Sequence, residues 1–178
     1  MKQLEIRRMI LAAFFIALGL VLPFLTGQIP TFGRMLLPMH IPVLLCGFIL
    51  GWPYGMAVGL VLPLFRSSLF GMPPVFPTAA AMTFELGAYG FLTGYLYQRL
   101  PKGNASVYIN LILAMLGGRI VWGAASLILY DLSNQPFSWQ MFMAGAVVNA
   151  IPGIILQLIA IPAIVIALEK NGYLKRLR

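Results

Sequence analysis

Residues 9–25 read MILAAFFIALGLVLPFL and contain no charged side chain. A helix needs about 20 predominantly apolar residues to cross a bilayer, within a range of roughly 17 to 25. Similar segments recur along the chain, so that 61% of all residues are hydrophobic and only 9% are charged. A soluble domain carries roughly 25% charged residues and has no means of burying this much apolar surface. The composition therefore predicts an integral membrane protein.

Five more apolar segments follow the first and predict further transmembrane helices. The six predicted spans are Met9–Leu25, Leu36–Leu50, Tyr54–Phe70, Thr78–Gln98, Ser106–Leu129 and Trp139–Ala167. The second span is expected to be short and irregular because Pro38 and Pro42 interrupt its outer end. The predicted fold class is thus an all-α membrane protein with six transmembrane helices, organised as one domain over residues 1–178.

The basic residues gather at both ends of the chain and at one hydrophilic break. They are Lys2, Arg7, Arg8, Arg99, Lys102, Lys170, Lys175, Arg176 and Arg178. Six spans place all of them on one side of the bilayer, and only Arg34 and Arg66 remain for the opposite loops. Lysine and arginine are enriched on the cytoplasmic side, so we expect both termini there. Topology and anionic headgroups account for the net charge of +8, and we expect no nucleic-acid binding.

Several kinds of chemistry lack their sequence signature. The chain contains no Gly-x-x-x-x-Gly-Lys-Ser/Thr loop, no His-Glu-x-x-His and no serine nucleophile elbow. Its single cysteine, Cys46, lies in an apolar run and allows neither an intrachain disulfide nor a cysteine-based metal cluster. We therefore expect no enzyme, no metal site, no cofactor and no ATP hydrolysis in this chain.

Ionisable residues inside a membrane are costly and usually face the protein interior or a wet cavity. The candidates are His40, Arg66, Glu85, Arg119 and Asp131. Glu85 is expected about 10 Å below the outer end of its helix and needs a cation, either Arg66 or Arg119. That pair is either structural or linked to a ligand. Arg66 either extends to the outer interface or binds an anionic ligand, and His40 either packs between helices or contacts a ligand.

Other polar and aromatic residues are candidates for a substrate pocket. Arg119 offers a guanidinium that binds a carboxylate in bidentate fashion, if it does not simply pair with Glu85. Asn149 and Gln157 are eight residues apart on the sixth span and are expected on one helix face, for ligand contact or for helix–helix hydrogen bonds. The remaining candidates for the pocket walls, or alternatively for interfacial anchors, are Trp122, Tyr89, Phe70 and Phe76.

Three runs of sequence carry a family resemblance. They are LLPMHIPVLLCGF at 36–48, RSSLFGMPP at 66–74 and FELGAYG at 84–90. The chain resembles the substrate-binding S components of energy-coupling factor (ECF) vitamin transporters over nearly its whole length. Within that family it looks most like the pantothenate group. Because members share a fold and differ in vitamin, the fold does not name the substrate.

The resemblance implies a bacterial, multi-pass membrane protein that captures a vitamin from outside with high affinity. It implies assembly with a membrane coupling subunit and two cytoplasmic ATPases, which hydrolyse the ATP, and release of the vitamin by toppling of the S component. Ala13 and Ala17 would form the docking site for the coupling subunit. The loop Gly27–Met35, with Gln28 and Arg34, would cover the ligand. For anionic pantothenate, Arg66 or Arg119 would supply a cationic contact, with Arg34 acting from the lid.

Three alternatives remain open. In the first, the chain serves another vitamin, such as riboflavin, folate, pyridoxine or a thiamine precursor. A stand-alone secondary transporter would need coupling-ion ligands, for which Glu85 and Asp131 are the candidates. An intramembrane enzyme would rely on His40 and Glu85 without an evident nucleophile or metal.

Overall fold

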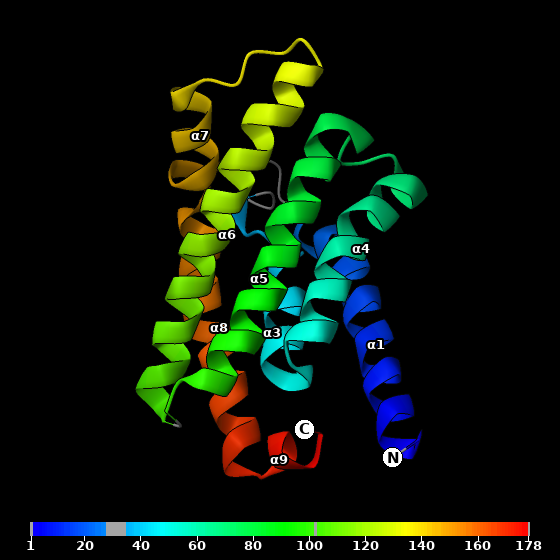
Figure 1. Ribbon diagram of the computed structural model, residues 1–178, viewed down its shortest axis with the longest axis vertical. Coiled ribbons are helices and arrows are strands. Elements are labelled where there is room, and N and C mark those ends of the chain that lie inside the picture. The colour runs from blue at the N-terminus through cyan, green and yellow to red at the C-terminus, as the bar shows by residue number, and fades with distance from the viewer. Residues whose placement is uncertain (1, 28–34, 102, 178) are drawn as a thin grey trace.

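The computed structural model describes residues 2–27, 35–101 and 103–177, and these parts of the chain form helices without any β-strand. The helices form an elongated bundle (Figure 1). In chain order they are α1 (Lys2–Gly27), α3 (His40–Leu50), α4 (Trp52–Phe70), η1 (Val75–Ala79), α5 (Ala80–Arg99), α6 (Asn104–Leu132), α7 (Trp139–Ala146), η2 (Val148–Ala150), α8 (Ile151–Lys170) and α9 (Tyr173–Leu177). The predicted all-α class is confirmed.

Among the described helices, three segments are long and apolar enough to cross a membrane by length and composition. They are Gln3–Thr26, Asn104–Leu132 and Trp139–Lys170. Helix α3 is apolar but has only 11 residues, which extend about 16 Å at 1.5 Å per residue. The predicted short second segment is therefore confirmed. Its irregular part precedes α3, where Leu37 adopts a φ of 50° and a turn leads into His40.

Glycines bring α3, α4 and α5 into close contact. A Cβ atom added to Gly90 of α5 would lie 2.0 Å from the carbonyl oxygen of Gly55 in α4. One added to Gly59 of α4 would lie 2.2 Å from the carbonyl oxygen of Leu86, and one on Gly47 of α3 would lie 2.1 Å from the Thr93 hydroxyl. Small residues allow such backbone approach between membrane helices. This packing fixes the relative positions of the three helices that carry His40, Arg66 and Glu85.

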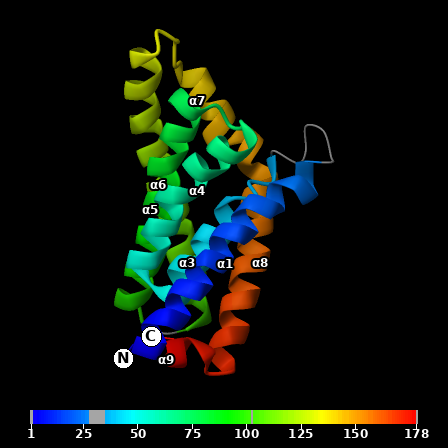
Figure 2. The ribbon, with the colours of Figure 1, turned by 90° about the vertical axis from the view of Figure 1, so that its right-hand side faces the viewer.

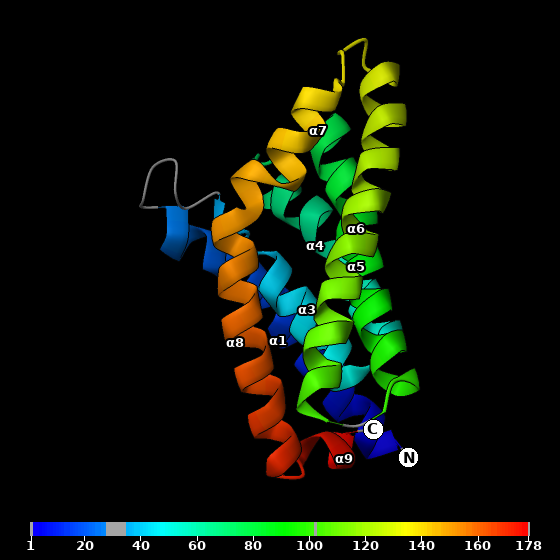
Figure 3. The same ribbon diagram turned by 90° about the vertical axis from the view of Figure 1, so that its left-hand side faces the viewer.

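Both termini lie at the same end of the bundle (Figures 1 and 2). The Arg8 side chain joins them, because its Nε donates a hydrogen bond to the carbonyl oxygen of Leu177 at 2.7 Å. Helix α5 ends and α6 begins at this same end (Figure 3). The basic clusters of the sequence, at the two chain ends and at the break between α5 and α6, thus lie at one end of the bundle.

The last apolar segment is broken, which the sequence interpretation did not anticipate. Helix α7 ends at Ala146, a short turn of 3-10 helix follows, and α8 starts at Ile151. The expectation that Asn149 and Gln157 share one helix face is therefore wrong. Asn149 lies exposed in the break, whereas the Gln157 side chain is only 1% exposed. Pro152 in the first turn of α8 fits this break, since proline is favoured at the start of a helix.

Candidate functional site

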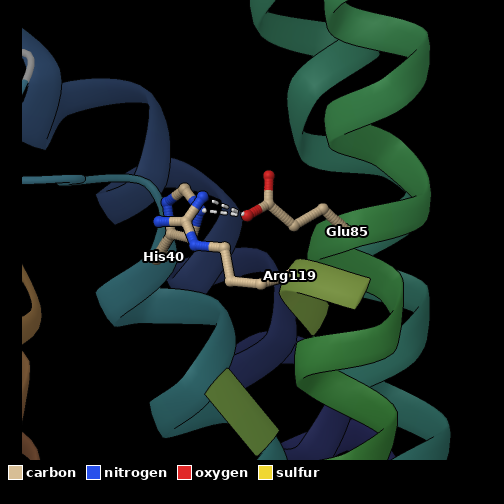
Figure 4. A network of polar contacts seen from close by, with 3 residues as sticks. All are labelled: His40, Glu85 and Arg119. Atoms are coloured by element: carbon tan, nitrogen blue, oxygen red, sulfur yellow. Dashed lines mark hydrogen bonds and ion pairs between the residues drawn. The ribbon is translucent and has the colours of Figure 1, made fainter. Parts of the chain in front are cut away.

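Three helices bring one acidic and two basic side chains together inside the bundle. Glu85 of α5 accepts a hydrogen bond at Oε1 from Nη1 of Arg119 in α6, at 2.7 Å. The same oxygen lies 3.4 Å from Nε2 of His40 in α3. The side chains of Glu85 and His40 are 2% and 3% exposed, and that of Arg119 is 14% exposed. Figure 4 shows both partners directed at one carboxylate oxygen, while the other oxygen points away from them.

Tyr89 supports this cluster from one helical turn below Glu85. Its ring meets the His40 imidazole edge-on, with 5.3 Å between the centroids. Gly118 makes the space, because a Cβ there would lie 2.6 Å from the Tyr89 ring. Gly118 immediately precedes Arg119, so the same turn of α6 both accommodates Tyr89 and presents the guanidinium. Tyr89 therefore orients His40 and is itself almost fully buried.

Several polar atoms of the cluster lack hydrogen-bond partners within the described parts of the chain. They are Nδ1 and Nε2 of His40 and Nη2 of Arg119, and all are buried. The 3.4 Å contact of His40 Nε2 with the Glu85 carboxylate lacks hydrogen-bond geometry. Roughly 90% or more of buried polar groups have a partner in native proteins. The nitrogens of His40 and Arg119 that lack hydrogen-bond partners thus mark a place where a polar ligand or water is expected.

A cavity of about 400 Å³ adjoins the cluster. Its walls come from α1, the turn before α3, the start of α3, α4, the loop after α4, η1 and the start of α5. They comprise Pro23, Leu37, Pro38, Met39, His40, Arg66, Met72, Pro73, Pro74, Thr78 and Met82. Small-molecule pockets are mostly apolar, hold a few placed polar groups and measure roughly 300–1,000 Å³. This cavity meets that description, and His40 and Arg66 are its ionisable wall residues.

The Arg66 side chain is held in place from several sides. Its Nη1 donates a hydrogen bond to the carbonyl oxygen of Leu20 at 2.8 Å. Its guanidinium carbon lies 5.0 Å from the ring centroid of Phe24 and 5.5 Å from that of Phe70. No carboxylate of the described residues forms an ion pair with it. Arg66 is thus positioned by a carbonyl and two rings, and no carboxylate within the described structure neutralises its charge.

The structure separates the other predicted site residues from this cavity. Trp122 stacks on Phe142 with 5.9 Å between the centroids and meets Phe137 edge-on, in an aromatic cluster between α6 and α7. Phe70 holds Arg66 and is not a wall residue. Gln157 is buried with its Nε2 unpartnered, and Asn149 is exposed in the helix break. Gln28 and Arg34, the predicted lid residues, lie outside the described residues.

Some cavity residues carried no signal in the sequence. Met39, Met82 and Pro23 are apolar, and an apolar residue that faces a cavity looks the same in a sequence as one that faces lipid. Ser67 did offer a signal, as a hydroxyl in an apolar helix. Its Oγ donates to the carbonyl oxygen of Pro73 at 2.6 Å and so fixes the loop that closes one side of the cavity.

Comparison with known families identifies the chain as a transporter component. The model of the family described as ECF transporter, substrate-specific component, matches residues 7–165. The chain belongs to this family. No curated protein and no solved structure matches the chain. The resemblance inferred from the three sequence runs is confirmed at the level of the family, whose members are transporter components and not enzymes.

As an ECF substrate-specific component, the protein acts on a small molecule and associates with components of an ECF module. Of the three segments that are long and apolar enough to cross a membrane, the one in α1 is the least buried within the described structure. Ala13 and Ala17 lie on its exposed side, whereas Phe15 and Gly19 face the bundle. Bulky neighbours such as Ile10 and Phe14 flank the two alanines and are also exposed.

Proposed function

We propose that this S component binds pantothenate and delivers it to an ATP-driven ECF importer. The observation that carries the proposal is Arg66, an ordered guanidinium without a carboxylate partner among the described residues, on the wall of a mostly apolar cavity. A vitamin that is anionic at neutral pH supplies the missing charge. Glu85 does not oppose such a ligand, because Arg119 neutralises it.

We propose that the bundle crosses the membrane six times with both termini in the cytoplasm of a bacterial cell. The location of the cavity supports this orientation. Pro23, Arg66 and Thr78 occupy the end of α1, the later part of α4 and the segment before α5. These helix ends are opposite the chain termini. With the basic termini in the cytoplasm, the cavity is on the outer side, where a vitamin arrives.

The proposed lid is the loop Gly27–Met35, which includes Gln28 and Arg34. Pro23 and Leu37 stand on either side of this segment in the sequence, and both line the cavity. A charged residue such as Arg34 in this segment would add a second cationic contact to a bound carboxylate.

Transport is assigned to a complex in which partner subunits hydrolyse ATP. The chain has no phosphate-binding loop, and its family works as one component of an ECF module. The proposed docking surface for the membrane coupling subunit is the α1 face around Ala13 and Ala17. Small residues there let a partner helix approach closely.

Native mass spectrometry of the protein purified in detergent tests the substrate assignment. We expect a complex heavier than the protein by the mass of pantothenate, either as purified or after addition of the vitamin. Riboflavin, folate, pyridoxine and a thiamine precursor serve as competitors at equal concentration. Retention of one of these, with no pantothenate complex at any concentration, would contradict the assignment.

A further inference from the structure

We infer that the cavity binds the two ends of its substrate through different side chains, and this inference rests on the proposed function. Arg66 takes a carboxylate at one end. His40, beside the neutralised Glu85, takes an uncharged group that can donate and accept hydrogen bonds, such as a hydroxyl, at the other. The substrate class that follows is a monocarboxylate with a neutral polar group at its far end.

The charge balance of the site is the first argument. Glu85 and Arg119 compensate each other at 2.7 Å inside the bundle. A second carboxylate placed there would face Glu85, and an ammonium group would face Arg119. Arg66 has no such counter-charge in the described part of the chain. The cavity therefore has one charged pole, which is positive, and one pole whose charges already cancel.

The unpartnered nitrogens of His40 are the second argument. A neutral imidazole carries one N–H donor and one bare acceptor nitrogen. Both nitrogens of His40 are buried and lack a hydrogen bond, although the residue is a wall of the cavity. A hydroxyl group is both donor and acceptor, so it satisfies either ring nitrogen. The Tyr89 ring packs edge-on against the His40 imidazole and holds the orientation of that ring.

The composition of the remaining wall is the third argument. Arg66 and His40 have separate contacts: Arg66 with Leu20, Phe24 and Phe70, and His40 with Glu85 and Tyr89. Apart from these two residues and Thr78, the wall is apolar and includes Met39, Met72, Met82 and prolines. The other polar wall side chain is Thr78, and its hydroxyl already lies 3.3 Å from the Tyr130 hydroxyl. Polar recognition is thereby confined to the two poles, and the methionines adapt to the apolar middle of a ligand.

Pantothenate fits this pattern, because it has a carboxylate at one end and hydroxyl groups at the other. Two analogues isolate the two poles. One lacks the hydroxyl groups and keeps the carboxylate, and the other has a hydroxymethyl group in place of the carboxylate. The full chain in detergent is titrated calorimetrically with each ligand, as the wild type, His40→Phe and Arg66→Gln. Each variant is then compared with the wild type for pantothenate and for the analogue that lacks the corresponding group.

Each variant is expected to lose affinity only for ligands that carry the group bound by the replaced side chain: the hydroxyls for His40 and the carboxylate for Arg66. His40→Phe should weaken pantothenate about tenfold, the usual effect of a neutral hydrogen bond in a desolvated site, and should leave the analogue without hydroxyls unchanged. Arg66→Gln should weaken pantothenate by about 30-fold or more and leave the hydroxymethyl analogue unchanged. Asn110→Leu is the matched control, since Asn110 is a buried polar residue that donates to the Thr93 carbonyl away from the cavity. It should bind all three ligands like the wild type.

The selectivity of the wild type provides a test that does not depend on the folding of any variant. The wild type should bind both analogues more weakly than pantothenate and should bind a dicarboxylate of similar length more weakly still. Two results would overturn the inference that the two ends are bound by different side chains. One is an equal loss of affinity of His40→Phe for pantothenate and for the analogue without hydroxyls. The other is binding of the dicarboxylate by the wild type as tightly as pantothenate. Absence of pantothenate binding by the wild type would instead remove the proposed function itself.

Discussion

The guanidinium of Arg119 and the carboxylate of Glu85 form an ion pair between α6 and α5, at 2.7 Å and with Glu85 only 2% exposed. The pair links two helices beside His40, a residue of the cavity wall. It neutralises the acidic residue that would otherwise repel an anionic substrate. The same contact thus serves the stability of the bundle and the electrostatics of the site.

Removal of one partner of this pair should destabilise the protein strongly. Breaking a buried ion pair leaves an uncompensated charge and typically costs about 3–5 kcal/mol. Glu85→Gln should therefore lower the thermal unfolding midpoint in detergent by many degrees. Glu5→Gln, which changes an exposed acid near the N-terminus, is the control and should leave the midpoint unchanged. A wild-type midpoint for Glu85→Gln would show that the pair contributes nothing to stability.

Arg66 should contribute more to pantothenate binding than Arg119 does. Arg66 is a cavity wall residue, whereas Arg119 is occupied by Glu85. Loss of a charge-assisted contact in a desolvated site costs roughly 2–5 kcal/mol, or about 30-fold or more in affinity. Calorimetric titration of Arg66→Gln and Arg119→Gln, with the folding of each checked by thermal unfolding, compares them. Unchanged affinity in both folded variants would exclude an arginine clamp and favour a neutral vitamin.

Bulky side chains at Ala13 and Ala17 should prevent assembly without affecting the vitamin site. Both residues lie on the exposed side of α1, and tryptophans there would keep a partner helix at a distance. The double variant Ala13→Trp with Ala17→Trp should bind vitamin like the wild type and fail to co-purify with the coupling subunit.

The chain offers a matched control for this experiment on another helix. Ala163 and Ala167 have the same spacing on α8 and are also exposed. Tryptophans at these two positions add the same apolar bulk to the lipid-facing surface and should leave assembly intact. If the α1 variant assembles normally, or if both variants fail alike, α1 is not the docking surface.

The glycine contacts between α4 and α5 should tolerate no side chain. A Cβ at Gly90 would lie 2.0 Å from the carbonyl oxygen of Gly55, so Gly90→Ala must push the two helices apart. Overpacking of this kind costs typically 1–3 kcal/mol. We expect a clearly lower unfolding midpoint for Gly90→Ala than for Gly103→Ala, because nothing lies within 4 Å of a Cβ at Gly103. Equal midpoints would mean that the helices do not depend on this approach.

The charged pair was predictable from the sequence because depth and charge leave few choices. A carboxylate inside a membrane needs a cation at similar depth, and Arg66 and Arg119 were the available partners for Glu85. The pair with Arg119 is confirmed. The contribution of His40 was not decided by the sequence, since a lone histidine in an apolar run either packs between helices or contacts a ligand.

The break after α7 and the walls of the cavity were not predictable in the same way. Apolar residues continue through 139–167, so composition gives no boundary, and Pro152 was the one local sign of a new helix start. The separation of Trp122 from the cavity depends on the direction in which α7 folds back onto α6. Such tertiary placement is set by packing between distant segments, which produces no periodic pattern in a single sequence.

Uptake of labelled pantothenate into liposomes tests the central claim most directly, because it separates a substrate-binding component from a self-sufficient transporter. The chain should be reconstituted alone, with imposed proton or sodium gradients, and together with a coupling subunit and its ATPases, with and without ATP. We predict concentrative uptake only when the chain, the module and ATP are all present. Concentrative uptake by the chain alone, driven by an ion gradient, would contradict the account.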